Sequence, residues 1–150
     1  MRGREHLLDD IERELTLVSR HQLATVAKGV LERSAYLMLS RIDATGPMTA
    51  RELAGALQLE ISTVTRQVAA MLRDEVVERI PDPAGGVARR LRITPTGATR
   101  LATDRARYRA GLGTVVADWP ADDCAELYRL LRGLNERIEA LQGAPWPRQE

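Results

Sequence analysis

The amino-acid sequence predicts a mainly α-helical chain with one short β-hairpin, an α+β fold. Apolar residues recur every three or four positions over most of the 150 residues, which is the spacing of amphipathic helices. Between residues 76 and 93 the period changes to two around a dense proline and glycine turn, which indicates paired strands. Because 44% of the residues are hydrophobic and 29% are charged, the chain is expected to fold around an ordinary globular core.

Length and composition exclude several classes of protein. The length suits one domain, or two small lobes that share a core. A single cysteine excludes an internal disulfide framework, and no signal peptide or membrane-spanning apolar run is present, so we expect a cytoplasmic protein. His6 and His21 lie about 22 Å apart along one predicted helix and cannot share a metal. No nucleophile, phosphate-binding or dinucleotide-binding motif occurs, so we expect no enzymatic activity, metal or cofactor.

Two helices are expected in the first third of the chain. The first covers residues 5–29, and its apolar stripe consists of Leu8, Ile11, Leu15 and Val18. The second covers residues 31–44. It ends at Thr45-Gly46-Pro47, since glycine allows a left-handed cap and proline cannot continue a helix.

A helix-turn-helix is expected next. In the capping box Thr49-Ala50-Arg51-Glu52, the Thr49 hydroxyl can accept from the Glu52 backbone, and the Glu52 carboxylate can reach back to Thr49. The short helix that this box opens is followed by the tight connection Gln58-Leu59-Glu60 and a helix from Ile61 to Asp74. Two amphipathic helices joined by so short a turn are typical of this motif.

A β-hairpin is expected directly after these helices. Residues 76–80 are rich in β-branched side chains, residues 81–86 are dense in proline and glycine, and residues 90–93 alternate polar and apolar. A hairpin in this position is a wing. Residues 31–95 are therefore expected to form a winged helix-turn-helix lobe.

The C-terminal third is expected to be helical again. Thr94 and Pro95 begin a helix that runs toward Trp119, and Pro120 begins another with an apolar seam at coiled-coil spacing. We expect residues 1–30 and 96–143 to form a dimerisation base, and residues 144–150 to be a frayed tail. The alternative is that both stripes pack inside one monomer. The seam is Cys124, Leu127, Leu131, Leu134, Ile138 and Leu141, and the expected dimer contacts are Leu8, Ile11, Leu15, Leu127, Leu131, Leu134 and Ile138.

The helix Ile61–Asp74 carries the strongest functional signal. Apolar side chains share one face, and the opposite face holds hydroxyls, alanine and arginines, with no acid before Asp74. Short side chains let a helix axis approach a major groove, and arginine can bind guanine with two hydrogen bonds. The alternative is an ordinary solvated basic face. Candidate DNA-binding residues on this helix are Ser62, Thr63, Thr65, Arg66 and Arg73.

Charge is unevenly distributed, although the net charge is only +1. Residues 86–110 hold seven arginines and one acid, whereas residues 114–150 hold four bases and seven acids. Nearly all basic residues are arginine, with Lys28 the one lysine. Arginine suits phosphates and guanine edges. Genome base composition explains the same bias equally well.

From about Leu31 to Leu141, the chain resembles MarR-type transcriptional regulators. The matching segments include Glu52-Leu53-Ala54, Ser62-Thr63-Val64-Thr65-Arg66, Asp82-Pro83 and Thr94-Pro95-Thr96-Gly97, and their order and spacing hold without a gap. The resemblance implies a homodimeric winged-helix regulator, usually a repressor that a small ligand or an oxidant releases. It assigns base reading to Ser62, Thr63, Thr65 and Arg66, and it places Arg51 near the DNA backbone.

Three positions depart from the pattern of this family. Gly85, Gly86 and Val87 stand at the wing tip, where the family usually has an acid followed by arginines. Arg89 and Arg90 are the candidate substitutes from the strand. Glu75 occupies the place of a usual glycine, so either Glu75 adopts a left-handed conformation or the turn differs. Glu60 stands where aspartate is frequent, and it is a poorer helix cap.

The function expected from the sequence is sequence-specific binding of double-stranded DNA. Because one recognition helix reads only a few base pairs, two copies about 34 Å apart are expected on a pseudo-palindromic operator. The candidate effector pocket comprises His21, Tyr36, Arg41 and Tyr108, although an ordinary helix surface explains each of them as well. Cys124 is expected to be a packed side chain. The alternative function is a winged-helix interaction module whose basic face binds an acidic protein.

Overall fold

The computed structural model describes residues 3–20 and 31–148 of the chain. Its helices are α1 (Arg4–Arg20), α2 (Arg33–Thr45), α3 (Ala50–Leu57), α4 (Ile61–Arg73), α5 (Pro95–Val115) and α6 (Ala121–Gln142), and its strands are β1 (Val77–Ile80) and β2 (Arg90–Ile93). The predicted order of elements is confirmed. The predicted first helix extended to residue 29, and its last part, with His21, lies outside the described residues.

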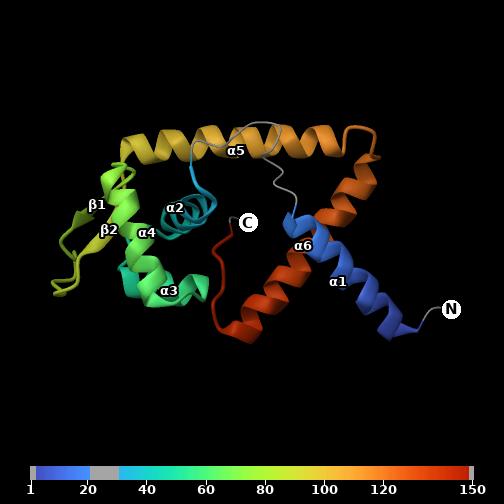
Figure 1. Ribbon diagram of the computed structural model, residues 1–150, viewed down its shortest axis with the longest axis horizontal. Helices are drawn as coiled ribbons and strands as arrows, with labels where there is room; N and C mark the ends of the chain where they lie inside the picture. Colours follow the sequence, from blue (N-terminus) through green and yellow to red (C-terminus); the bar gives the residue numbers. More distant parts are fainter. Residues whose placement is uncertain (1–2, 21–30, 149–150) are drawn as a thin grey trace.

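The molecule is a lobe and a base joined by one long helix. In Figure 1, α2, α3, α4 and the hairpin gather at one end of α5, and α6 begins at its other end. The hairpin β1–β2 is antiparallel, with Val77 opposite Ile93 and Ile80 opposite Arg90. Met48 extends it by a bridge to Leu91, with backbone N···O distances of 2.7 and 3.1 Å. This bridge fixes the wing to the segment that precedes the helix-turn-helix.

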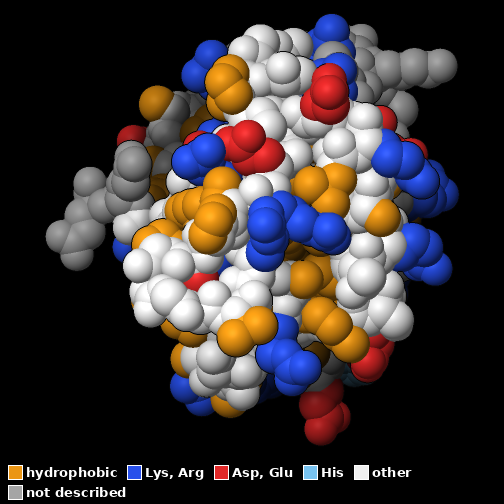
Figure 2. Space-filling view, turned by 90° about the vertical axis from the view of Figure 1, so that its left-hand side faces the viewer, with side chains coloured by type: hydrophobic (Ala, Val, Ile, Leu, Met, Phe, Trp, Pro, Cys, Tyr) orange, Lys and Arg blue, Asp and Glu red, His pale blue; other side chains and the backbone are white. Residues whose placement is uncertain are grey.

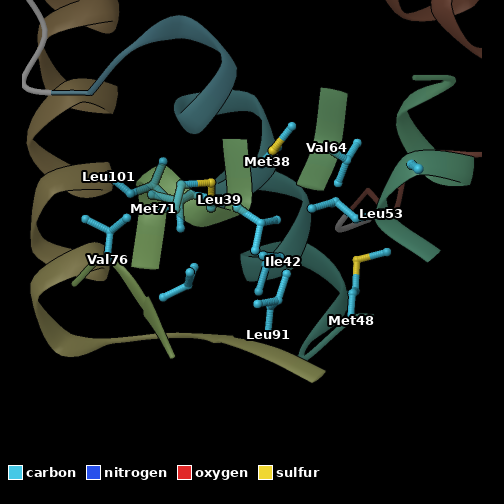
Figure 3. Close-up of a cluster of buried hydrophobic side chains, with 13 residues drawn as sticks. Met38, Leu39, Ile42, Met48, Leu53, Val64, Met71, Val76, Leu91 and Leu101 are labelled. Carbon is cyan, nitrogen blue, oxygen red and sulfur yellow. The ribbon is translucent and has the colours of Figure 1, made fainter. Parts of the chain in front are cut away.

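The hydrophobic core lies in the lobe. Figure 3 shows its buried side chains converging from α2, α4, β2 and the start of α5. By contrast, α1 and α6 bury none of the residues that the structure describes in them. The lobe therefore has its own core, and most large apolar side chains of α1 and α6 remain exposed. The core residues are Met38, Leu39, Ile42, Met48, Leu53, Ala54, Val64, Val68, Met71, Val76, Val77, Leu91 and Leu101.

The predicted capping box at the start of α3 is present. The Thr49 hydroxyl accepts from the Glu52 backbone at 3.1 Å, and the Glu52 carboxylate accepts from the Thr49 backbone at 3.1 Å. At the start of α4, Glu60 occupies the N-cap and makes no side-chain cap hydrogen bond, as expected for glutamate. The two N-caps differ because the side chain of glutamate is longer than that of threonine and does not accept a hydrogen bond from the first turn of the helix.

A Schellman turn ends α4 with Glu75 in a left-handed conformation, at φ 57°. The Val76 amide donates to the Met71 carbonyl and the Glu75 amide donates to the Leu72 carbonyl, both at 3.1 Å. Val76 and Met71 are both buried in the core, which completes the motif. The turn keeps its geometry, and Glu75 bears the backbone strain that glycine would avoid.

The segment Thr94-Pro95-Thr96-Gly97 docks α5 onto this turn. The Thr94 hydroxyl donates to the Glu75 carbonyl at 2.6 Å and accepts from the Gly97 amide at 3.0 Å. Gly97 is buried so close to the Val76 carbonyl that a Cβ atom would overlap it. A glycine at this position therefore sets how closely α5 approaches the lobe.

The C-terminal tail differs from the frayed segment that the sequence predicted. Arg148 forms two hydrogen bonds with the Glu139 carboxylate, at 2.5 and 2.7 Å, and the Trp146 amide donates to the same group at 3.0 Å. From α2, the Arg41 guanidinium donates to the Pro145 carbonyl at 2.9 Å and lies 5.4 Å from the Trp146 ring centre. Residues 144–148 thus form a strap between α6 and α2, which Figure 1 shows as the red C-terminal segment.

Candidate DNA-binding interface

Helix α4 presents a polar face because its apolar face is held in the core. Val64, Val68 and Met71 are buried, and they fix the rotation of the helix. As a result, Ser62, Thr65, Arg66 and Arg73 are exposed, and Thr63 is half-buried. The Thr65 hydroxyl donates to the Ile61 carbonyl at 2.8 Å, so its oxygen can still accept a hydrogen bond. The predicted face of this helix is therefore free to contact another molecule.

Four exposed arginines of the lobe have no partner inside the described part of the chain. Arg66 and Arg73 on α4, Arg51 in the first turn of α3, and Arg89 before β2 are all exposed, and none forms a hydrogen bond or ion pair with another described residue. Figure 2 views the lobe from the end that carries the wing, and basic side chains spread over this side with a cluster near its centre. Unpaired guanidinium groups are suited to phosphates and to base edges.

Arg90 has a different place from the one that the sequence predicted. Its guanidinium donates to the Glu52 carboxylate at 2.8 and 3.2 Å, to Asp82 at 3.2 Å and to the Pro47 carbonyl at 3.1 Å. These contacts join the wing, the capping box of α3 and the segment before it, and the bond to Glu52 raises the pKa of Arg90. Arg90 is an internal brace, and a phosphate contact would require it to leave these partners.

Asp82 is a structural residue of the wing whose pairing with Arg90 was not predicted from the sequence. Its carboxylate accepts from the Ala84 amide at 2.9 Å and from Arg90 at 3.2 Å. The bond from the Ala84 backbone holds the pKa of Asp82 below its usual range. The Asp-Pro pair was visible in the sequence as turn chemistry. Its pairing with Arg90 depends on the hairpin register.

The candidate effector residues are not brought together. Tyr36 and Tyr108 contact each other, with ring centres 4.8 Å apart, and burial raises the pKa of Tyr36. Arg41 instead lies under the tail, beside Trp146. Because Tyr36 and Arg41 are five positions apart on α2, they face different sides of that helix. His21 lies outside the described residues, so the structure supports a tyrosine pair and no shared pocket of the four.

The predicted dimer contacts lie on the surface of the monomer. Leu8, Ile11 and Leu15 on α1 are 43–55% exposed, and Leu131, Leu134 and Ile138 on α6 are 40–44% exposed. Leu127 and Cys124 are half-buried, and Cys124 is a free thiol. Much of both stripes is therefore accessible to solvent in one monomer, and the homodimer remains a prediction.

Among the described residues, no helix is long and apolar enough to cross a bilayer. No cluster of three histidine, cysteine or carboxylate side chains there has an arrangement that would hold a metal ion.

A two-stranded wing behind an exposed, arginine-bearing helix defines a winged helix-turn-helix protein of the DNA-binding class. The MarR family model matches residues 31–84. The protein described as the uncharacterized HTH-type transcriptional regulator YxaD of Bacillus subtilis is 32% identical over 130 residues, which cover 84% of this chain and 91% of that protein. The chain belongs to the MarR family of transcriptional regulators.

Solved structures share the same fold. A MarR family protein from Bacillus stearothermophilus superposes with a TM-score of 0.77 at 20% identity, covering 91% of this chain and 99% of that one. A mutant of MarR from E. coli complexed with operator DNA gives a TM-score of 0.66 at 18% identity, covering 89% of this chain and 99% of that one. Because these superpositions cover about nine-tenths of the chain, the structural similarity includes α5 and α6 as well as residues 31–84.

Proposed function

We propose that this regulator is a homodimeric repressor that binds a pseudo-palindromic operator with α4 in successive major grooves. The observation that carries the proposal is the exposed face of α4, where Ser62, Thr65 and Arg66 point away from a core that fixes the helix. The E. coli relative solved with operator DNA supports the same class of ligand for this chain. In this arrangement Arg66 reads a base edge, Arg73, Arg51 and Arg89 contact phosphates, and short side chains allow close approach.

The exposed apolar stripes of α1 and α6 support the homodimer. Exposed apolar patches on soluble proteins often mark sites of protein–protein contact. A second copy would cover Leu8, Ile11 and Leu15 together with the α6 seam, and it would bring the second recognition helix to the spacing of one DNA turn. Specific binding needs both helices, because one reads too few base pairs.

We further propose that a small molecule releases the repressor. The support is an open groove of ≈ 680 Å³ that lies between α2 of the lobe and α6 of the base, and the strap residue Trp146 forms part of its wall. A ligand in this groove would change the angle between lobe and base, and hence the spacing of the two recognition helices. Its walls include Leu37, Tyr128, Leu131, Asn135, Trp146 and Arg148. A compound that releases DNA from the wild type and not from Leu37→Arg would support this site, whereas equal release would refute it.

Titration of Arg66→Ala against a selected operator tests the base-reading role of α4. We expect specific binding to weaken by ~1–3 kcal/mol and the preference at one base pair to be lost. Arg109→Ala is the matched control, since Arg109 is an exposed arginine of α5 and has no role in the proposed interface. An unchanged base preference in Arg66→Ala would remove Arg66 from the base-reading residues. Weak binding without sequence preference, in the wild type at about 150 mM salt, would favour the interaction module instead.

A further inference from the structure

The wing tip is a compact turn built around Asp82. The Asp82 carboxylate accepts from the Ala84 amide at 2.9 Å, and its backbone carbonyl accepts from the Gly85 amide at 2.9 Å. Gly85 has φ 80°, a conformation that favours glycine. At Gly86, a Cβ atom would overlap the Asp82 carboxylate. A side chain at Gly86 would therefore require the Asp82 carboxylate to move, and one at Gly85 would strain the turn.

No cation stands at the apex of the wing. Val87 is fully exposed, at 103% of its reference area, and the residues around it from 84 to 88 are exposed and uncharged. Arg90 is held by Glu52 and Asp82 at the root of the wing. Arg89 remains, exposed and without a partner among the described residues, where the chain returns to β2. The wing thus carries the free guanidinium of Arg89 beside its tip and the uncharged side chain of Val87 at the tip itself.

Whether the width of the minor groove affects the affinity of a wing depends on the charge of the side chain that the wing inserts into it. A narrow minor groove over an A·T tract has an enhanced negative potential, which attracts an arginine or lysine inserted into it. A valine gains nothing from that potential. A guanidinium placed beside the groove contacts phosphates, and phosphate contacts carry no direct sequence information.

We propose that the wing contacts operator DNA only through the sugar–phosphate backbone, with Arg89 on a phosphate and Val87 at the mouth of the minor groove. The protein then binds operators with and without an A·T tract beneath the wing with equal affinity. This inference rests on the proposed function, because it assumes that α4 occupies the adjacent major groove. It assigns all base reading to α4.

Two operators that differ only beneath the wing provide the test, one with an A·T tract and one with G·C pairs at those positions. We expect the wild type to bind both with equal affinity. Val87→Arg places a cation at the tip, so it is expected to bind the A·T operator several-fold more tightly than the G·C operator. Val87→Gln, a matched long and uncharged variant, is expected to behave as the wild type. Because Val87 is fully exposed, these changes leave the fold intact, which circular dichroism can verify.

Arg89→Ala tests the phosphate contact. It is expected to weaken binding to both operators equally and to reduce the slope of log affinity against log salt by about one. A wild-type preference for the A·T operator, no discrimination by Val87→Arg, or a changed base preference in Arg89→Ala would each overturn the inference. If the wild type binds neither operator more tightly than an unrelated duplex, the proposed function itself fails, and that outcome is distinct from the other three.

Discussion

At the scale of single residues, the sequence predicted which side chains of α4 are buried but not which arginines are paired. The period of apolar residues in α4 predicted which side of that helix is buried, and Val64, Val68 and Met71 are buried as expected. The sequence also made Arg90 of the wing a candidate DNA contact, because a free guanidinium and a paired one look alike in a sequence. Its partners Glu52 and Asp82 lie 38 and eight positions away, and only the hairpin register and the docking of the wing bring the three together.

At Glu75 we expect the replacement Glu75→Gly to raise the free energy of unfolding by up to about 1 kcal/mol, because glycine adopts a left-handed conformation without strain. The Glu75 side chain makes no hydrogen bond with the described residues, so the replacement breaks no contact there. Urea unfolding of both variants measures the effect.

Glu75→Ala is the control for this prediction. Alanine removes the same carboxylate near the end of α4 but keeps the Cβ atom that causes the strain. We therefore expect it to give no gain in stability. If alanine stabilises the protein as much as glycine, the gain comes from the lost charge, and the account of backbone strain is contradicted.

At the scale of elements, motifs with local hydrogen bonds were the most predictable. The capping box of Thr49 and Glu52 and the start of α5 at Pro95 follow from residues three positions apart, whose contacts hardly depend on the rest of the fold. The tail was not predictable. Glu139 and Arg148 are separated by a helix end at Gly143 and by two prolines, and Arg41 lies about a hundred positions away. Contacts of that kind depend on where whole elements lie.

Docking of α5 on the lobe is expected to depend on Gly97. In Gly97→Ala, the new Cβ overlaps the Val76 carbonyl, so α5 must move and the free energy of unfolding should fall by about 1–3 kcal/mol. Gly113→Ala is the matched control in the same helix, where a Cβ meets open space. Because alanine is the better helix former, this control should stabilise α5 by up to about 1 kcal/mol. Thermal unfolding compares the two, and a stable Gly97→Ala protein would contradict the close approach.

For the whole molecule, the essential feature is that the lobe has a core and the base has none of its own. The sequence predicted a base with two apolar stripes and left open whether they pack within one monomer. Exposed Leu8, Ile11, Leu131 and Leu134 favour a second copy as their partner. Within one monomer, the strap of residues 144–148 is a further link between α6 and α2.

The strap should detach in acid. The two hydrogen bonds from Arg148 lower the pKa of Glu139 from its ordinary 4.5 to about 2. Because the pKa is lowered in the folded protein, the ionised Glu139 carboxylate stabilises the strap fully at a pH above its ordinary pKa of 4.5. This contribution is lost as the pH falls from about 4.5 to about 2. In a Trp119→Phe background, Trp146 fluorescence should report this change.

Two variants on α6 serve as controls for the acid transition. Glu139→Gln removes the titrating group, so the change in Trp146 fluorescence over that pH range should disappear. Glu136→Gln lies one turn away and pairs with Arg132 instead, so it should leave the transition as it is in the parent. A transition that persists in Glu139→Gln would show that another group holds the strap.

The most direct test of the central claim is a selection from random duplex DNA with the full chain at physiological salt, followed by measurement of how many copies bind the selected site. The account predicts two inverted half-sites with centres about 10 base pairs apart, bound by two copies, each with α4 in a major groove. Selection of a lone half-site bound by one copy, or of no motif at all, would contradict it.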